Sequence, residues 1–334
     1  MNSKKIDALN ILLILISLLI AILFPFKLFL FSYAFFGPLH YLTEINWLNE
    51  NNYFIKSSKK WKVFYISLCL FISFIALTKS SIDILENSIL YYILKDFSLL
   101  LIILILFSTS LIIFKKTLHI IASLFFSIIL SIFLKTYANS AMIFLGLFIP
   151  TLIHVYLFTL LFMIYGAIKS KSQLGLFCSA LLFLVLVLIL FIDISDYEYE
   201  LSQSIDNIFQ LTSMPEIINF ISDKFGEGHE FCFNDLSIIG IKTQIFIAFA
   251  YTYHYLNWFS KTSIIGWKKS LSNKKSFYIV CIWLTSIYLY LTDYQSGYIA
   301  LFVLSLIHVL LEFPLNIVTI KEILLLTKYK HNKG

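Results

Sequence analysis

Two histidine–glutamate pairs with the same spacing stand near opposite ends of this chain of 334 residues. The first is His40 with Glu44, and the second is His308 with Glu312; both lie in or at the end of apolar segments. Residues four apart share one face of a helix, so each pair can present an imidazole and a carboxylate to the same point. Ionisable groups inside a membrane cost several kcal/mol and by default indicate a functional site.

Five of the seven histidines fall in predicted helices, at the midplane or in the cytoplasmic half of the membrane in the topology given below. They are His40, His119, His154, His254 and His308. Neutral imidazole is the commonest metal ligand. A single histidine is explained as easily by an interhelical hydrogen bond. His119 follows Lys115-Lys116, which also fits a position at the membrane interface.

The set as a whole predicts a metal site. The predicted ligands are His40, His154, His254 and His308. Glu44 and Glu312 are either further ligands, and so catalytic in role, or acceptors that fix the tautomer of a ligating ring. Imidazole and carboxylate donors without thiolates suit non-haem iron, zinc or copper, and iron (Fe²⁺) with open positions would bind dioxygen.

The segments around these histidines resemble motifs of the bacteriorhodopsin-related-protein family, the integral-membrane beta-carotene 15,15'-dioxygenases that make retinal. That family carries Gly-x-Pro-His-Gly-x-x-Asp, then His-Phe-Gly, then an aromatic-rich helix ending His-Ser-x-Arg-His, and finally Pro-His. The similar segments here are Gly37 to His40 with Glu44, Phe246 to His254, and Leu306 to His308 with Glu312.

This chain departs from the family pattern at two places. It has no His-Phe-Gly, for which His154 is the candidate position and His119 the alternative. Trp258 stands where the family has a second histidine four residues after His254. The resemblance implies a histidine-ligated iron in a helical membrane oxygenase, with a carotenoid as the family's substrate.

The composition sets the class of protein that must position these residues. Apolar residues make up 60% of the chain and the mean hydropathy is +0.88, whereas soluble proteins have about 45–50% apolar residues. The net charge of +6 comes from 25 lysines without arginine, placed in short loops, which disfavours nucleic-acid binding. The four cysteines form no metal or disulfide pattern. We predict an all-α, polytopic membrane protein.

About ten membrane-spanning helices satisfy the requirement for about 20 mostly apolar residues. They are predicted at 8–25, 27–43, 62–79, 89–113, 117–135, 139–167, 173–194, 237–258, 275–293 and 296–316. The second is short and broken by Gly37-Pro38. No cleavable signal peptide is expected, because Pro25-Phe26-Lys27 follows the first apolar run in place of small residues. We predict a single transmembrane domain over 1–334.

Lysine placement predicts that both termini are cytoplasmic, since 19 of the 25 lysines then lie inside. Ten of the 19 acidic residues lie between Asp193 and Asp235, in an extracytoplasmic loop at about 195–236. Within it, Ser213-Met214-Pro215-Glu216 predicts a capping box that opens a short amphipathic helix. Asn257 and Trp258, at the end of the eighth helix, are interpreted as interfacial residues.

The leading hypothesis is a metal-dependent, iron-dependent oxygenase of a bacterial inner (cytoplasmic) membrane, acting on an apolar small molecule that enters from the lipid. One alternative is a bis-histidine haem protein that transfers electrons. Another is a transporter that couples substrate movement to protons or a cation. Membrane lipids are the remaining expected partners, and nucleic acid is not.

Overall fold

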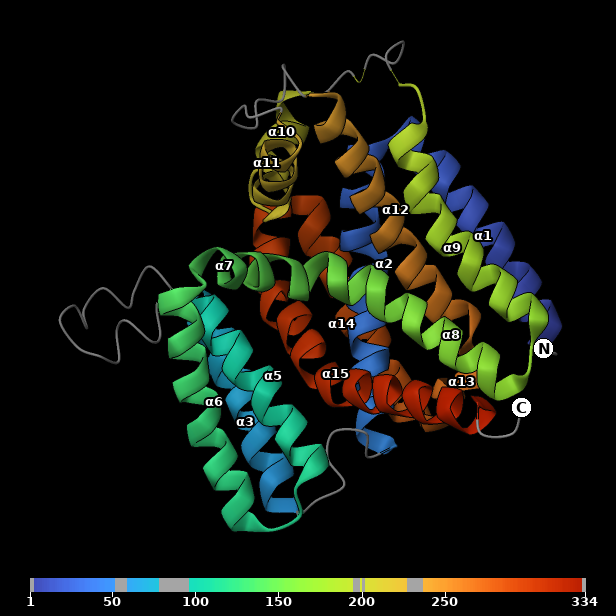
Figure 1. Ribbon diagram of the computed structural model, residues 1–334. Coiled ribbons are helices and arrows are strands. Elements are labelled where there is room, and N and C mark those ends of the chain that lie inside the picture. The colour runs from blue at the N-terminus through green and yellow to red at the C-terminus, as the bar shows by residue number, and fades with distance from the viewer. Residues whose placement is uncertain are drawn as a thin grey trace. The chain divides into compact units, whose positions relative to one another are not determined.

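A computed structural model describes residues 3–51, 59–77, 96–194, 199, 202–226 and 237–331, and its secondary structure over these ranges is helical (Figure 1). The all-α prediction is confirmed for this part of the chain. The elements are α1 (Ser3–Leu23), α2 (Pro25–Glu50), α3 (Lys59–Leu77), α5 (Phe97–Ile113), α6 (Thr117–Tyr137), α7 (Asn139–Phe148), the π-helix η2 (Ile149–Phe158), α8 (Thr159–Ser170), α9 (Gln173–Phe191), α10 (Gln203–Phe209), α11 (Met214–Lys224), α12 (Ile238–Ser260), α13 (Thr262–Ile265), the 3-10 helix η3 (Trp267–Ser270), α14 (Asn273–Thr292) and α15 (Tyr294–His331).

Six helices among the described residues are long and apolar enough to cross a membrane. The chain therefore has the make-up of a membrane-spanning protein. Apart from a few end residues, the described part of each predicted span is helical; the spans at 62–79 and 89–113 are described only to Leu77 and from Asp96 onward. The span predicted at 139–167 comprises α7, η2 and α8, with a kink at Thr151. The count of ten spans and the orientation stay predictions.

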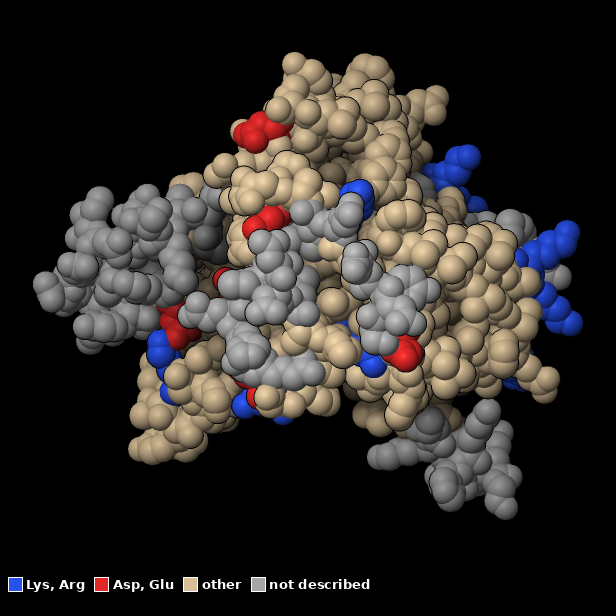
Figure 2. Space-filling model, turned by 90° about the horizontal axis from the view of Figure 1, so that it is seen from above, with Lys and Arg blue, Asp and Glu red and all other residues tan. Residues whose placement is uncertain are grey.

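Large apolar side chains cover the outer faces of several of these helices. On α6, Phe125, Phe126 and Ile129 are 62%, 61% and 67% exposed. Charged side chains are sparse on the face shown in Figure 2. Exposed large apolar side chains close together on one helix are typical of a surface that contacts lipid or another protein.

The chain divides into two compact units. The first comprises Met1–Leu42 with Val155–Tyr298, and the second comprises Thr43–His154 with Ile299–Gly334. The divisions fall inside α2, η2 and α15, so each of these three helices contributes residues to both units. The single-domain organisation predicted from the sequence stays a prediction.

In the first unit, α1, α9 and α12 lie side by side, α8 packs against α9, and α11 packs against α12 (Figure 1). A buried amide joins α1 to α12. Asn10 Nδ2 donates to the Ile6 carbonyl at 2.9 Å and to Ser260 Oγ at 3.0 Å, while its Oδ1 accepts from the Tyr253 hydroxyl at 3.2 Å. Each polar atom of this side chain therefore has a partner, as buried polar groups in proteins normally do.

In the second unit, α5 packs against α3, α6 and α7 (Figure 1). The core of this contact includes the buried side chains of Leu99, Ile102 and Ile103. Gly146 allows the close approach of α7 to α5, because a Cβ at this position would lie 2.0 Å from Ser98 Oγ. A larger residue at Gly146 would push the two helices apart.

Proline residues interrupt the regular hydrogen bonding of three helices that carry the predicted histidine ligands. Pro38 lies inside α2, Pro314 lies inside α15, and Pro150 stands at the start of η2. The expected break at Gly37-Pro38 is wrong, because α2 continues to Glu50. A proline removes one N–H and leaves the carbonyl four residues earlier without its helical donor, so these segments need other hydrogen-bond partners.

In α15, a tyrosine of the second unit donates to the backbone carbonyl that a proline leaves without its helical donor. Pro314 cannot donate to the Leu310 carbonyl, and the Tyr65 hydroxyl donates to it instead at 2.7 Å. Tyr65 is fully buried on α3. Side-chain donors commonly satisfy carbonyls released by proline in membrane helices. The contact fixes the turn of α15 that lies between His308 and Glu312.

Side chains also cap helices at their ends. The amphipathic helix predicted from Pro215 is confirmed as α11, with Ile217 and Ile218 buried. The predicted capping box is wrong, because the Ser213 side chain makes no capping hydrogen bond. At the start of α15, hydrogen bonds from the Ser296 hydroxyl and backbone N–H hold the pKa of Asp293 below its usual value.

Candidate metal centre

The four histidines predicted as ligands are all buried. Their exposed fractions are His40 1%, His154 1%, His254 8% and His308 2%. Glu44 and Glu312 are also buried, at 3% and 1% exposed. His119 is exposed on α6 and its ring contacts Phe114. The interfacial interpretation therefore fits His119, and it does not belong to either histidine pair described below.

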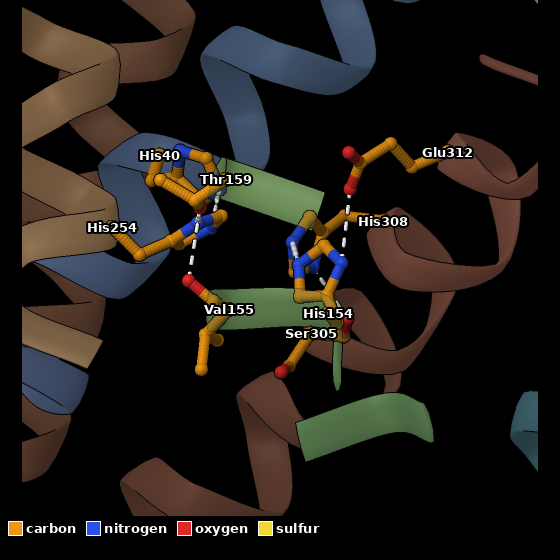
Figure 3. Close-up of polar contacts among 8 residues, drawn as sticks. All are labelled: His40, His154, Val155, Thr159, His254, Ser305, His308 and Glu312. Atoms are coloured by element: carbon orange, nitrogen blue, oxygen red, sulfur yellow. Dashed lines mark hydrogen bonds and ion pairs between the residues drawn. The ribbon is translucent and has the colours of Figure 1, made fainter. Parts of the chain in front are cut away.

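The first unit brings together His40 from α2 and His254 from α12, called the first-unit pair below. Their Nε2 atoms lie 3.0 Å apart, with ring centroids at 4.6 Å and planes crossing at 78° (Figure 3). The two residues are 214 positions apart in the chain. Packing between α2 and α12 thus creates an imidazole pair that local spacing does not show.

A threonine fixes the tautomer of His254. Thr159 Oγ1 donates to the Val155 carbonyl at 2.9 Å and lies 2.7 Å from His254 Nδ1. The hydroxyl has a single hydrogen, so toward His254 it accepts and Nδ1 carries the proton. This inference assigns the lone pair of His254 to Nε2, the atom that faces His40. If His40 carries its proton on Nε2, this N–H donates to the lone pair of His254 Nε2, and the two rings form an ordinary hydrogen bond.

Aromatic side chains surround the first-unit pair. The His40 ring contacts those of Tyr41, Tyr255 and Trp258, with centroids at 5.8, 5.3 and 5.5 Å. The Tyr41 and Tyr255 hydroxyls hydrogen-bond each other at 2.9 Å. Gly37 permits this arrangement, because a Cβ there would lie 2.9 Å from the Tyr41 hydroxyl oxygen.

The interfacial interpretation of Asn257 and Trp258 is wrong. Both are buried, at 7% and 8% exposed, because α12 is covered along most of its length within the first unit. Trp258 occupies the position at which the resembled family has a histidine, and here it packs against the His40 ring. The indole therefore acts as part of the apolar surroundings of the imidazole pair.

The second unit brings together His154 from η2 and His308 from α15, called the second-unit pair. Their Nε2 atoms also lie 3.0 Å apart, with ring centroids at 4.8 Å and planes crossing at 75° (Figure 3). His154 lies in a π-helix that contains the non-helical residue Thr151. Such π-helical segments occur frequently at functional sites. The sequence pattern predicts one regular helix over 139–167 and gives no sign of this distortion.

In the second-unit pair, an oxygen acceptor lies beside the Nδ1 atom of each ring. His308 Nδ1 lies 2.6 Å from the Ser305 carbonyl, and His154 Nδ1 lies 3.0 Å from Glu312 Oε2, which is ion-pair distance. The Ser305 carbonyl only accepts, so His308 Nδ1 carries the proton and this neutral ring has its lone pair on Nε2. The contact of His154 Nδ1 with Glu312 Oε2 has ion-pair distance without hydrogen-bond geometry, and a neutral His154 ring with its proton toward this carboxylate also has its lone pair on Nε2. Two lone pairs then face each other across 3.0 Å.

A cation between the two rings would remove the repulsion between their Nε2 lone pairs. Two Nε2 lone pairs repel unless a metal ion or an extra proton lies between them. Donor atoms at about 2.1 Å from one metal ion lie about 3.0 Å apart at right angles and about 3.4 Å apart in a tetrahedron. The 3.0 Å separation of the two Nε2 atoms matches adjacent ligands of one ion. Carboxylates that orient a ligating histidine through its other nitrogen are common around metal ions.

Carboxylates bring negative charge to the same place in the second unit. Glu44, His308 and Glu312 each offer one donor atom, and these three atoms lie within 4.8 Å of one another. Two negative charges at this separation in a buried site repel each other strongly unless a positive charge compensates them. A divalent cation would neutralise both and would have neutral imidazoles as its other ligands.

Two buried side chains near these histidines were not singled out from the sequence. Thr159 fixes His254, and its hydroxyl gives no signal in an otherwise apolar helix of the sequence. Asn316 follows Glu312 by four residues on α15 and is 2% exposed. Extending the four-residue spacing from His308 and Glu312 by one more step would have found Asn316.

Comparisons of the chain with models of known protein families, with curated proteins and with solved structures give no match. The resemblance to the membrane carotene dioxygenases therefore stays a prediction.

Proposed function

We propose that the protein is a metal-dependent membrane oxygenase that contains non-haem iron and acts on a lipid-soluble substrate such as a carotenoid. The observation that carries this proposal is the second-unit pair, in which the Nε2 atoms of His154 and His308 face each other at 3.0 Å and an oxygen acceptor lies beside each Nδ1 atom. The bound cation would be held by these two imidazoles with Glu44 and Glu312 beside them.

The donor set favours iron over the other candidates. Two histidines with a carboxylate and open positions are characteristic of non-haem Fe(II) oxygenases. Zinc accepts the same donors, and copper accepts the imidazoles. When bound, iron with an open position would supply the activation of dioxygen. The histidine pairs and the set of Glu44, His308 and Glu312 include none of the three cysteines among the described residues, Cys69, Cys178 and Cys281.

The haem alternative fits the geometry less well. Axial imidazoles of a bis-histidine haem lie on opposite sides of the iron, about 4 Å apart for bonds of about 2.0 Å. Both histidine pairs have Nε2 atoms at 3.0 Å. The carboxylates beside the second-unit pair also have no role in haem ligation.

A lipid-soluble substrate is supported by the surroundings of the candidate centre. The histidines and glutamates are buried among apolar and aromatic side chains of helices whose outer surfaces are also apolar. A substrate that partitions into the membrane can approach such a protein without leaving hydrocarbon. The carotenoid class comes from the family resemblance, and the oxygenase activity rests on it together with the donor set.

Elemental analysis by mass spectrometry tests the proposal, applied to protein purified in detergent without chelators, with an absorption spectrum of the same sample. We expect about one iron per chain and no haem band. A haem band would replace the oxygenase with the electron-transfer alternative. Protein without stoichiometric metal would contradict the proposal and favour the transporter. Iron-containing protein would then be tested for dioxygen-dependent cleavage of beta-carotene.

A further inference from the structure

Asn316 on α15 is a buried amide without a hydrogen-bond partner among the described residues. Its side chain is 2% exposed, and neither Oδ1 nor Nδ2 makes a hydrogen bond to any of them. Buried polar groups in proteins are nearly always paired, so each exception calls for an explanation. In Asn316, both the Nδ2 donor and the Oδ1 acceptor lack a hydrogen bond among the described residues.

The position of Asn316 connects it to the candidate metal centre. His308, Glu312 and Asn316 are successive residues at four-residue spacing on α15, and all three belong to the second unit. Each step of four residues turns about 40° around the helix axis, so the three side chains form one buried polar stripe. The amide therefore lies one turn beyond a carboxylate that contacts the second-unit pair.

Asn10 shows what a buried amide with a structural role looks like in this protein. It is 1% exposed, and its hydrogen bonds join it to Ile6, Ser260 and Tyr253. Asn316 is as deeply buried and joins no elements through hydrogen bonds among the described residues. A structural role explains Asn10 and leaves Asn316 unexplained.

The chemistry of the amide indicates what it binds. A carboxamide offers an N–H donor and a carbonyl acceptor side by side. A hydroxyl-type oxygen, which both accepts and donates, satisfies both at once, whereas a purely apolar ligand satisfies neither. We propose that Asn316 binds a hydroxyl oxygen, of a water molecule or of an alcohol group on the substrate, one helical turn beyond Glu312 in the polar stripe that leads to the candidate metal centre. This inference rests on the proposed function.

The test uses the full chain in detergent, with cobalt(II) in place of iron so that the absorption spectrum reports on the ion's surroundings. Wild type, Asn316→Leu and Asn10→Leu are compared for cobalt content, thermal stability and spectrum, with and without the primary alcohol decanol. Decane, which lacks the hydroxyl, is the control ligand. We expect Asn316→Leu to keep wild-type cobalt content and stability, because no hydrogen bond among the described residues is removed, while Asn10→Leu melts at a lower temperature.

The ligand arm separates the two sources of the oxygen. If the alcohol is bound, Asn316→Leu lowers the affinity for decanol at least about tenfold, because both hydrogen bonds to the amide are lost. If water is bound, decanol has no effect and the cobalt spectrum of the alcohol-free protein changes in Asn316→Leu.

Two results would overturn the inference. One is a variant with the wild-type spectrum and wild-type decanol affinity, and the other is loss of stability in Asn316→Leu as large as in Asn10→Leu. Wild-type protein that takes up no cobalt would instead contradict the proposed metal centre, so the two failures are distinguishable.

Discussion

The two histidine pairs of this protein have nearly the same internal geometry and different surroundings. In both, two Nε2 atoms lie 3.0 Å apart and the rings cross at 75–78°. The first-unit pair has a threonine hydroxyl on one Nδ1 and rings of tyrosine and tryptophan around it. The second-unit pair has a backbone carbonyl on one Nδ1 and a carboxylate on the other.

This difference decides which pair needs a cation. In the first-unit pair, one imidazole can donate to the other, so the contact is satisfied by the chain alone. In the second-unit pair, a carbonyl or carboxylate oxygen lies beside each Nδ1 and favours the proton there, and Glu44 and Glu312 add negative charge nearby. A protonated Glu312 that donates to His154 would remove this need. The comparison therefore predicts that metal affinity depends mainly on the second unit.

The largest expected effect follows from removing a ligand of the second-unit pair. His308→Ala should weaken iron binding at least 100-fold, beyond the 10–100-fold typical of residues that only support ligands. Iron content after dialysis against a graded series of chelator concentrations measures this. His119→Ala, which changes an exposed histidine outside both pairs, is the control and should retain iron.

His254→Ala tests directly whether the two pairs differ in their contribution to metal binding. It removes one ring of the first-unit pair and leaves the carboxylates of the second unit unchanged. We expect it to lose less iron than His308→Ala under the same conditions. Equal loss in the two variants would show that the surroundings of the two pairs do not set their metal affinity, and the comparison would then be wrong.

The next largest effect is expected when the Glu312 carboxylate is replaced by an amide. Glu312→Gln keeps the size of the side chain and removes its charge, so His154 Nδ1–H loses its anionic acceptor. Iron affinity should fall about 10–100-fold, as for other carboxylates that orient ligating histidines. Glu322→Gln on the same helix, ten residues further on, is the matched control. Unchanged affinity in Glu312→Gln would indicate that Glu312 is protonated in the native protein.

The sequence predicted the chemistry of these sites better than their surroundings. The helical spans and the pairing of a histidine with a glutamate four residues later depend on local periodicity, which is readable without tertiary structure. Thr159 and His254 are 95 residues apart, and His154 lies in a kinked π-helix that contains Pro150. Such features depend on how helices pack, which composition and spacing do not encode.

The course of α2 shows the same limit. Gly37-Pro38 is a strong local signal for a break, yet the helix continues past it to Glu50. A tertiary contact supports the turn before Pro38, because the Trp283 indole N–H donates to the Phe35 carbonyl at 2.8 Å. Helix propensity is a weak prior that packing routinely overrides.

A smaller effect is expected in the first-unit pair. Thr159→Val removes the hydroxyl that accepts from His254 Nδ1 and leaves that N–H buried without its acceptor. The free energy of unfolding should fall by about 1–3 kcal/mol, measured by titration with denaturing detergent, while iron affinity stays near that of wild type. Thr109→Val is the control, since Thr109 makes the same bond to the carbonyl four residues earlier without contacting a histidine. Loss of iron in Thr159→Val would contradict the independence of the second-unit set.

The smallest expected effect concerns the helix that carries His308 and Glu312. Tyr65→Phe removes the donor to the Leu310 carbonyl, which Pro314 cannot replace, and should lower the free energy of unfolding by about 1 kcal/mol. Pro314→Ala restores a backbone N–H, so Tyr65→Phe should cost less in that background. The double-mutant cycle measures the coupling. Additive effects would show that the tyrosine does not compensate for the proline, and that the turn between His308 and Glu312 is held in place by other contacts of the second unit.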